Sequence, residues 1–196
     1  MKQIRLFLLF LAVTRLSGQT GEGSFDWTLS LSNQRELIAI SLERPVELTT
    51  GDRITFILKS RADCFVYVIA RDSENAVAVL YSNPVRNGET LNLGPIRITP
   101  PAGSETIFFV VSSRERSGLS QAVTTLRANP NSARAGQELL NQVYGLRRDS
   151  SLLGETPEQP LAMGGSVRGT DDTAGNTGGL LFSGTHTYVK ILTLEH

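Results

Sequence analysis

Apolar and polar positions alternate with a period of two over long stretches of the chain. Ile54, Phe56 and Leu58 fall on one face of a predicted strand, whereas Thr55 and Lys59 fall on the other. This alternation is typical of a β-strand with one buried face. Turn residues interrupt the pattern about every 8 to 12 positions, a spacing typical of β-sandwiches and small barrels.

Two stretches, residues 64–70 and 107–111, are instead apolar on both faces. A strand without a polar face has to be covered on both sides, so we expect both to be central strands. Further strands are predicted at 27–31, 35–43, 53–59, 76–81, 91–98 and 185–194. The sequence therefore predicts a mainly β protein, an immunoglobulin-like antiparallel β-sandwich, with Phe56, Phe65 and Phe109 between its two sheets.

The pattern changes after Gly118, where apolar residues recur at helical spacing over 119–128 and 133–148. We expect two helices, which form a helical insertion over residues 119–148. Ser132 can cap the second helix, and Arg147 with Arg148 suit its negative C-terminal end. Its apolar face is expected to pack on the edge of the sandwich and consists of Leu139, Leu140, Val143 and Leu146.

Residues 154–184 contain eight glycines and little apolar surface. Such a segment cannot bury enough apolar area to fold alone, so we expect a flexible loop before the last strand. The final residues 194–196 resemble the remnant of an affinity tag, and we assign His196 no function. The remaining chain, 19–194, is predicted to be a single domain, because 196 residues give room for one well-filled core.

The first residues have the order of an export signal. Lys2 and Arg5 flank an apolar run over 6–13, and the small residues Ser17 and Gly18 follow. We expect a signal peptide over 1–18 and a location in the periplasm or on the outer surface of a bacterium. The apolar run is too short to span a bilayer, so no integral membrane segment is expected after cleavage. Gln19 stands where a lipid anchor would need cysteine.

Charge argues against nucleic acid as a partner. The whole chain holds 19 basic and 19 acidic residues, and without residues 1–18 the basic residues fall to 16, a formal charge of −3. Nucleic-acid binding requires clustered lysine and arginine. Cys64 is the only cysteine, so no disulfide can form within the chain and the core has to supply the stability.

The pattern LxxGDxIxFxLxSxxDCFVYV over residues 48–68 resembles a bacterial domain-of-unknown-function family, number 4384. Asp72-Ser73, Leu80-Tyr81 and Asn83 follow it, and residues 103–107 and 111–113 are similar to the family's next block. Ser82 departs from the family's proline, and Asn75 stands near its customary turn glycine. The resemblance covers about 35–113 and implies an exported accessory domain without an accepted catalytic set. The matched residues Gly51, Asp52, Cys64 and Tyr67 suit turn and core positions.

Nucleophilic catalysis finds weak support in the sequence. Residues 118–122 share part of a nucleophile elbow around Ser120, but the second glycine is missing and no strand leads directly into it. His186 is the one histidine available as a base. Cys64 lies in an apolar run, where burial would raise the pKa of its thiol, so we expect it to fill the core. The sequence predicts no catalytic residues.

Metal and phosphate sites are also unsupported. One cysteine and one credible histidine cannot form a structural zinc site, and Asp171 with Asp172 lacks the spacing of a calcium loop. The glycine pairs 164–165 and 178–179 lack the lysine of a phosphate-binding loop. We expect no cofactor and no metal. A carboxylate pair for glycoside hydrolysis stays open, although four glutamates fit strand ends and solvent faces: Glu36, Glu43, Glu47 and Glu105.

We therefore expect a non-enzymatic module that presents the helical insertion and the glycine-rich segment to another envelope protein, or adds a partner strand at an exposed sheet edge. Two alternatives remain: an enzyme that acts on carbohydrate or peptidoglycan through carboxylates, and a structural subunit of an envelope assembly.

Overall fold

The computed structural model describes residues 24–33, 36–38, 40, 44–152, 161–162 and 179–196, so the predicted signal peptide over 1–18 lies outside the described residues. The described part holds eleven strands and two helices. Their bounds are β1 Ser24–Asn33, β2 Leu37–Ile38, β3 Val46–Glu47, β4 Arg53–Ser60, β5 Cys64–Arg71, β6 Val77–Val85, β7 Thr90–Arg97, β8 Ser104–Ser112, α1 Ser117–Ala128, α2 Ala133–Leu152, β9 Leu161–Ala162, β10 Gly179–Thr185 and β11 Thr187–Glu195.

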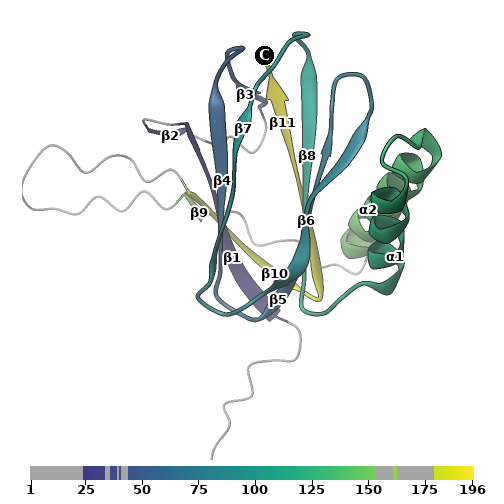
Figure 1. Cartoon of the computed structure of the whole chain (residues 1–196). Helices are drawn as coiled ribbons and strands as arrows, with labels where there is room; N and C mark the ends of the chain where they lie inside the picture. Colours follow the sequence, from purple (N-terminus) through teal and green to yellow (C-terminus); the bar gives the residue numbers. More distant parts are fainter. Residues whose placement is uncertain (1–23, 34–35, 39, 41–43, 153–160, 163–178) are drawn as a thin grey trace, which may run out of the picture.

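The strands form two sheets. Sheet A has the order β7-β4-β1-β10-β9, with β2 paired to the end of β1, and sheet B has the order β3-β11-β8-β5-β6. All strand pairs are antiparallel except β3 and β11. The two sheets face each other, and the helices lie on the outer side of sheet B (Figure 1). The prediction of a mainly β, antiparallel sandwich is confirmed.

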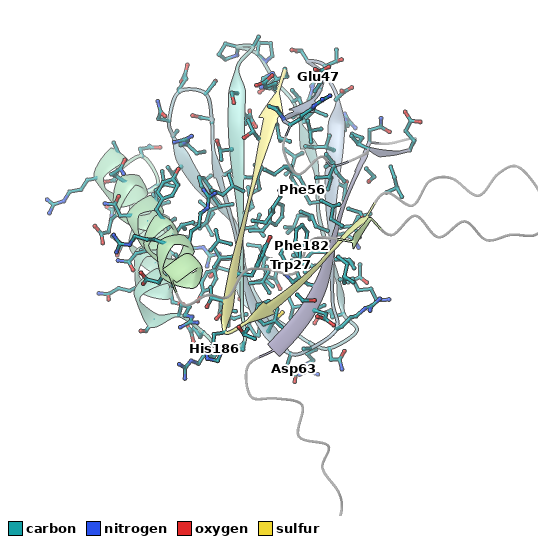
Figure 2. The ribbon with its side chains drawn as sticks, turned by 180° about the vertical axis from the view of Figure 1, so that it is seen from behind. Trp27, Glu47, Phe56, Asp63, Phe182 and His186 are labelled. Atoms are coloured by element: carbon teal, nitrogen blue, oxygen red, sulfur yellow. The ribbon has the colours of Figure 1, made fainter. Side chains whose placement is uncertain are left out.

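The main core lies between the two sheets. Sheet A contributes alternate residues of β1 and β4, among them Trp27 and Phe56, and sheet B contributes Val66, Val68 and Phe109. Phe109 contacts both rings, at centroid distances of 5.3 Å from Phe56 and 6.5 Å from Trp27. Figure 2 shows Trp27 and Phe56 in the interior between the strands. The alternation in the sequence therefore assigns the buried face of β4 correctly.

A second apolar cluster joins the helices to the outer face of sheet B. Tyr67 and Ile69 of β5 and Phe108 and Val110 of β8 pack there against both helices. Strands β5 and β8 are thus covered on both faces, as their continuous apolar runs predicted. The expected place of the helices, at the edge of the sandwich, is wrong, because they cover a face of sheet B. Phe65 is also misplaced by the prediction, since it shares the helix-facing side with Tyr67.

The second helix begins as predicted and ends later. The hydroxyl of Ser132 accepts a hydrogen bond from the backbone N–H of Ala135 at 3.2 Å, which is the expected cap. Helix α2 continues to Leu152, so the helical segment exceeds the predicted 119–148 at both ends. Arg147 and Arg148 therefore lie before the last turn, and their predicted place at the C-terminal end of the dipole is wrong.

The glycine-rich segment contains two strands that the sequence did not reveal, the short β9 and β10. Residues 179–184 were expected in the flexible loop, but they belong to β10, which pairs with β1 over seven residues. Leu180 and Phe182 are buried in the main core, and this burial stabilises a strand that its glycines disfavour. Residues 153–160 and 163–178 lie outside the described residues.

Polar turns close the strands as the sequence predicts. The carboxylate of Asp52 accepts the N–H of Thr49 at 2.8 Å, and Gly51 has a positive φ of 101°. Asp72 accepts the N–H groups of Glu74 and Ala76. Asn75, near the customary turn glycine of the family, has a φ of 68°, a conformation that asparagine tolerates better than most residues.

The last three residues are integrated into the sandwich. Leu194 is buried between the sheets, and Glu195 pairs with Glu47 of β3. The backbone of His196 exchanges two hydrogen bonds with Gly103, at 2.8 and 3.1 Å. Whether these residues come from a tag stays a prediction, but they complete β11 and its contacts.

Candidate functional site

Cys64 has the environment of a core residue. It is 5% exposed and faces the space between the sheets at the start of β5. Its Sγ lies 3.3 Å from the hydroxyl oxygen of Ser60, and that hydroxyl donates to the carbonyl of Ala62 at 2.6 Å. Burial raises the pKa of the Cys64 thiol, against the smaller opposing effect of the Ser60 contact. The predicted burial is confirmed, and a thiol in this state is a poor nucleophile at neutral pH.

Ser120 holds the first turn of α1 against sheet B. Its hydroxyl lies 2.8 Å from the hydroxyl of Tyr67, a residue of β5 that is fully buried. The same Tyr67 oxygen accepts the backbone N–H of Arg116 at 3.1 Å. Tyr67 therefore satisfies one backbone donor at the start of α1, where no intrahelical acceptor exists. These contacts give Ser120 a structural role in place of the open, strained turn of a nucleophile elbow.

His186 forms the tight turn between β10 and β11, with a positive φ of 63°. Its carbonyl oxygen accepts the hydroxyl of Ser112 at 2.8 Å and the backbone N–H of Ser113 at 3.0 Å. The guanidinium of Arg116 donates to the hydroxyls of Ser112 and Thr187. His186 lies at the end of the β10–β11 hairpin (Figure 2). In the described structure, no hydrogen bond joins its side chain to Ser120.

Of the four carboxylates considered for glycoside hydrolysis, three lie in the described residues. Glu36 and Glu47 are exposed, and Glu43 lies outside the described residues. Glu105 has its Oε1 at 3.5 Å from Nε2 of His196, whose side chain is fully buried at the end of the sandwich. Glu47 of β3 and Glu195 of β11 are paired in register, and both are exposed. The structure thus brings two glutamates together on an open strand end.

Among the described residues, no group of three or more His, Cys, Asp or Glu side chains lies close enough together to hold a metal ion. Asp171, Asp172 and the glycines 164, 165 and 178 lie outside the described residues. Among the described helices, none combines the length and the apolar character needed to cross a bilayer.

The sheets end in strands that pair on one side. Strand β6 pairs with β5 and strand β7 pairs with β4, and neither has a second described partner. Strand β11 pairs with β8 over its whole length, whereas β3 covers its other side at Leu194 and Glu195 alone. From Tyr188 to Thr193, no described strand lies beside the outer edge of β11. Unpaired strand edges are the usual acceptors of an added strand.

Lys190 is the unusual residue of this edge. It alternates with Val189 and Ile191, which face the helices, and it therefore shares the inner face with Tyr188 and Leu192. Lys190 is 8% exposed, and no hydrogen bond or ion pair of its ammonium group is found in the described structure. Burial lowers the pKa of Lys190, and the charge of Arg147 on α2 lowers it further.

Sequence reasoning missed this lysine as a candidate. The signal was present, because Tyr188, Leu192 and Leu194 form an apolar series with period two, and Lys190 occupies the one charged position in it. It also missed Arg116, which ties the β8–α1 connection to Thr187 through its guanidinium. No local pattern in the sequence indicates that contact, because the two residues are 71 positions apart.

Comparison with known proteins gives one match. Residues 47–115 match the family model described as a domain of unknown function (DUF4384), and no curated protein and no solved structure matches the chain. The matched segment runs from β3 through β8 and ends one residue before Arg116, so it supplies strands to both sheets. Both helices and the β10–β11 hairpin follow this segment. Residues 47–115 are thus similar to the DUF4384 family, which is the family that the resemblance in the sequence indicated.

Proposed function

We propose that this chain is an exported, non-enzymatic bacterial module that binds another protein of the cell envelope. Support for binding comes from the sheet edges, above all the outer edge of β11 between Tyr188 and Thr193, which has no described strand beside it. A strand edge presents backbone donors and acceptors that an extended partner segment can satisfy. This edge is the observation that carries the proposal.

The side chains that could act as a nucleophile, a base or a charged catalytic group are also consistent with the proposal. Cys64 is buried with a raised pKa, and the hydroxyl of Ser120 contacts Tyr67. The carbonyl of His186 and the guanidinium of Arg116 both bind Ser112. Each of these groups has a partner that accounts for its position in the fold. The proposal of export depends on the basic and apolar pattern of residues 1–18.

The alternative of a carbohydrate-active enzyme requires two carboxylates in a concave pocket, one of them kept protonated by its surroundings. Glu47 and Glu195, which the structure places side by side, are both exposed on a strand end. The geometry of this pair therefore favours a surface role over acid catalysis.

Crosslinking in the native envelope, with mass spectrometry of the captured proteins, tests the proposal. We expect capture of a defined partner by the full chain, and no capture above background would contradict a binding role. A buried interface above about 2,000 Å² in the purified complex would favour the alternative of a permanent structural subunit. Deletion of residues 154–184 would remove β10, so the test of the glycine-rich segment has to delete 163–178, which leaves both flanking strands in place.

A further inference from the structure

The open edges of the two sheets differ in how well they could receive another strand. Strand β7 contains Gly94 and Pro95 at a register shift against β4, and β6 contains Pro84 and a register shift at Leu80. Proline and bulges are common ways to block pairing at an edge strand. Strand β10 is flanked by β9 at Leu180 and Leu181.

The edge of β11 has none of these blocks. Its pairing with β8 is continuous over nine residues, without a register shift, and it contains no proline. From Tyr188 to Thr193, six successive residues lie on a regular strand without a described partner on the outer side. Six residues match the usual length of a strand. This is therefore the part of the described sandwich that is best shaped to accept an extended segment.

The charged side chains that we find near this edge, Lys190 and Arg147, are both positive. Lys190 points to the inner face beside Phe109, its partner in register on β8. Arg147 of α2 is exposed and close enough to lower the pKa of Lys190, so two cations lie near one another. In the described structure, neither has an ion pair with an acidic side chain. Burial of most of the Lys190 side chain disfavours its charged form, and an acidic group beside the ammonium would favour it.

We propose that the outer edge of β11, between Tyr188 and Thr193, binds an extended segment of a partner protein that places an aspartate or glutamate beside Lys190. A segment added to this edge would put its central side chain next to Lys190 on the same face, at the spacing of a cross-strand pair. Its neighbours two positions away would meet Tyr188 and Leu192, so apolar residues fit there. The inference rests on the proposed binding function and names its surface and the chemistry of the partner.

Lys190 also provides discrimination between partners. A strand with an apolar residue at the central position would complete the desolvation of the ammonium without supplying a negative charge. A strand with an acid there would satisfy the ammonium and gain the backbone bonds of the edge. The same lysine would therefore reject most exposed strands, including a second copy of β11, which would bring another lysine or an apolar residue.

Three synthetic peptides of about nine residues test the proposal. They share an alternating β-branched sequence and differ at the central position, which is aspartate, asparagine or lysine. Amide hydrogen exchange reports protection of residues 188–193, and the fluorescence of Trp27, the single tryptophan, reports binding because its ring contacts Tyr188 at 5.8 Å. We expect the aspartate peptide to bind about tenfold more tightly than the asparagine peptide, and the lysine peptide to bind weakest.

A matched pair of variants assigns the preference to one side chain. Lys190→Met keeps the apolar stem and removes the charge, so the aspartate and asparagine peptides should bind it equally. Lys59→Met makes the same change at an exposed position of β4 and should leave the preference intact. The peptide series on the unaltered protein needs no variant, so it decides the question even if Lys190→Met folds poorly.

Two results would overturn the proposal: no protection of 188–193 by any peptide at about 1 mM, or equal affinity for the aspartate and asparagine peptides. If the aspartate and asparagine peptides bound with equal affinity and Lys190→Met self-associated, the lysine would serve only to prevent strand pairing at this edge. Capture of an envelope partner in crosslinking, with no peptide preference, would leave the proposed function standing and reject this surface. The peptide preference without any captured partner would reject the proposed function and keep the specificity of the edge.

Discussion

Trp27 lies nearly flat on Phe182, with ring centroids 4.7 Å apart and an angle of 25° between the ring planes. The two residues are direct partners in the pairing of β1 with β10. The edge of Tyr188, on β11 of the opposite sheet, meets the Trp27 ring at 5.8 Å. The three rings therefore connect sheet A to sheet B at the hairpin that contains His186, and β10 is a full member of the core.

Phe182→Ala should lower the free energy of unfolding by about 3 to 5 kcal/mol, because it removes a fully buried ring that stacks on Trp27. Leu181→Ala is the matched control, since Leu181 is the next residue of β10, points to the other face and is partly exposed. It should cost less than half as much. Denaturant unfolding followed by tryptophan fluorescence measures both variants. Equal, small losses would contradict the placement of β10 in the core.

Gly94→Ala should destabilise the fold by about 2 to 4 kcal/mol. Gly94 has a φ of 147°, and an added Cβ would lie 2.6 Å from the carbonyl oxygen of Ile54 and 2.8 Å from the hydroxyl oxygen of Thr55. Gly145→Ala provides the contrast, because a Cβ there meets nothing within 4 Å and the residue lies inside α2. It should raise stability by about 0.5 to 1 kcal/mol. Thermal unfolding of both variants checks the opposite signs.

Cys64 should resist thiol reagents in the folded protein at neutral pH and react rapidly in denaturant. The thiol is 5% exposed, and its raised pKa leaves little of the reactive thiolate. Glu115→Cys in a Cys64→Ala background gives an exposed thiol for comparison and should react without denaturant. A native reaction rate of Cys64 close to that of the exposed thiol would show that the start of β5 opens readily.

Much of the fold follows from periodicity. The continuous apolar runs of β5 and β8 predict strands covered on both sides, and the structure supplies sheet A on one side and the helices on the other. The helical spacing of Leu139, Leu140 and Val143 predicts the face that fills the second cluster. The same reasoning, taken one step further, would have put the helices over a face of sheet B, because two doubly apolar strands need a second cover.

Other features depend on tertiary contacts that the sequence does not encode locally. Alternation shows which residues of a strand share a side, but not which side meets the other sheet, so Phe65 was assigned to the wrong cluster. The glycines around β10 disfavour a strand, and burial of Phe182 against Trp27 overrides that preference. The sequence places Lys190 on the same side of its strand as Tyr188 and Leu192, but only its register with Phe109 shows that this side faces the other sheet.

Tyr188 should make the protein lose stability at alkaline pH. Burial raises its pKa from 10.0 to about 12, against a smaller lowering by Arg147. Below pH 10 the tyrosine is neutral in both states, so stability is unaffected. Between pH 10 and 12 the unfolded chain has lost this proton and the folded chain still holds it, so the free energy of unfolding falls as pH rises, by at most about 3 kcal/mol in total.

Tyr188→Phe should remove that alkaline loss and leave stability below pH 10 almost unchanged, because the ring and its contacts with Trp27 and Phe182 remain. Chemical denaturation at a series of pH values measures the difference in slope. Ultraviolet absorbance of tyrosinate gives an independent reading, since one of the four tyrosines should ionise near pH 12 and disappear in the variant. The same alkaline slope in both proteins would mean that Tyr188 ionises in water, which would place it outside the core that holds the β10–β11 hairpin to sheet A.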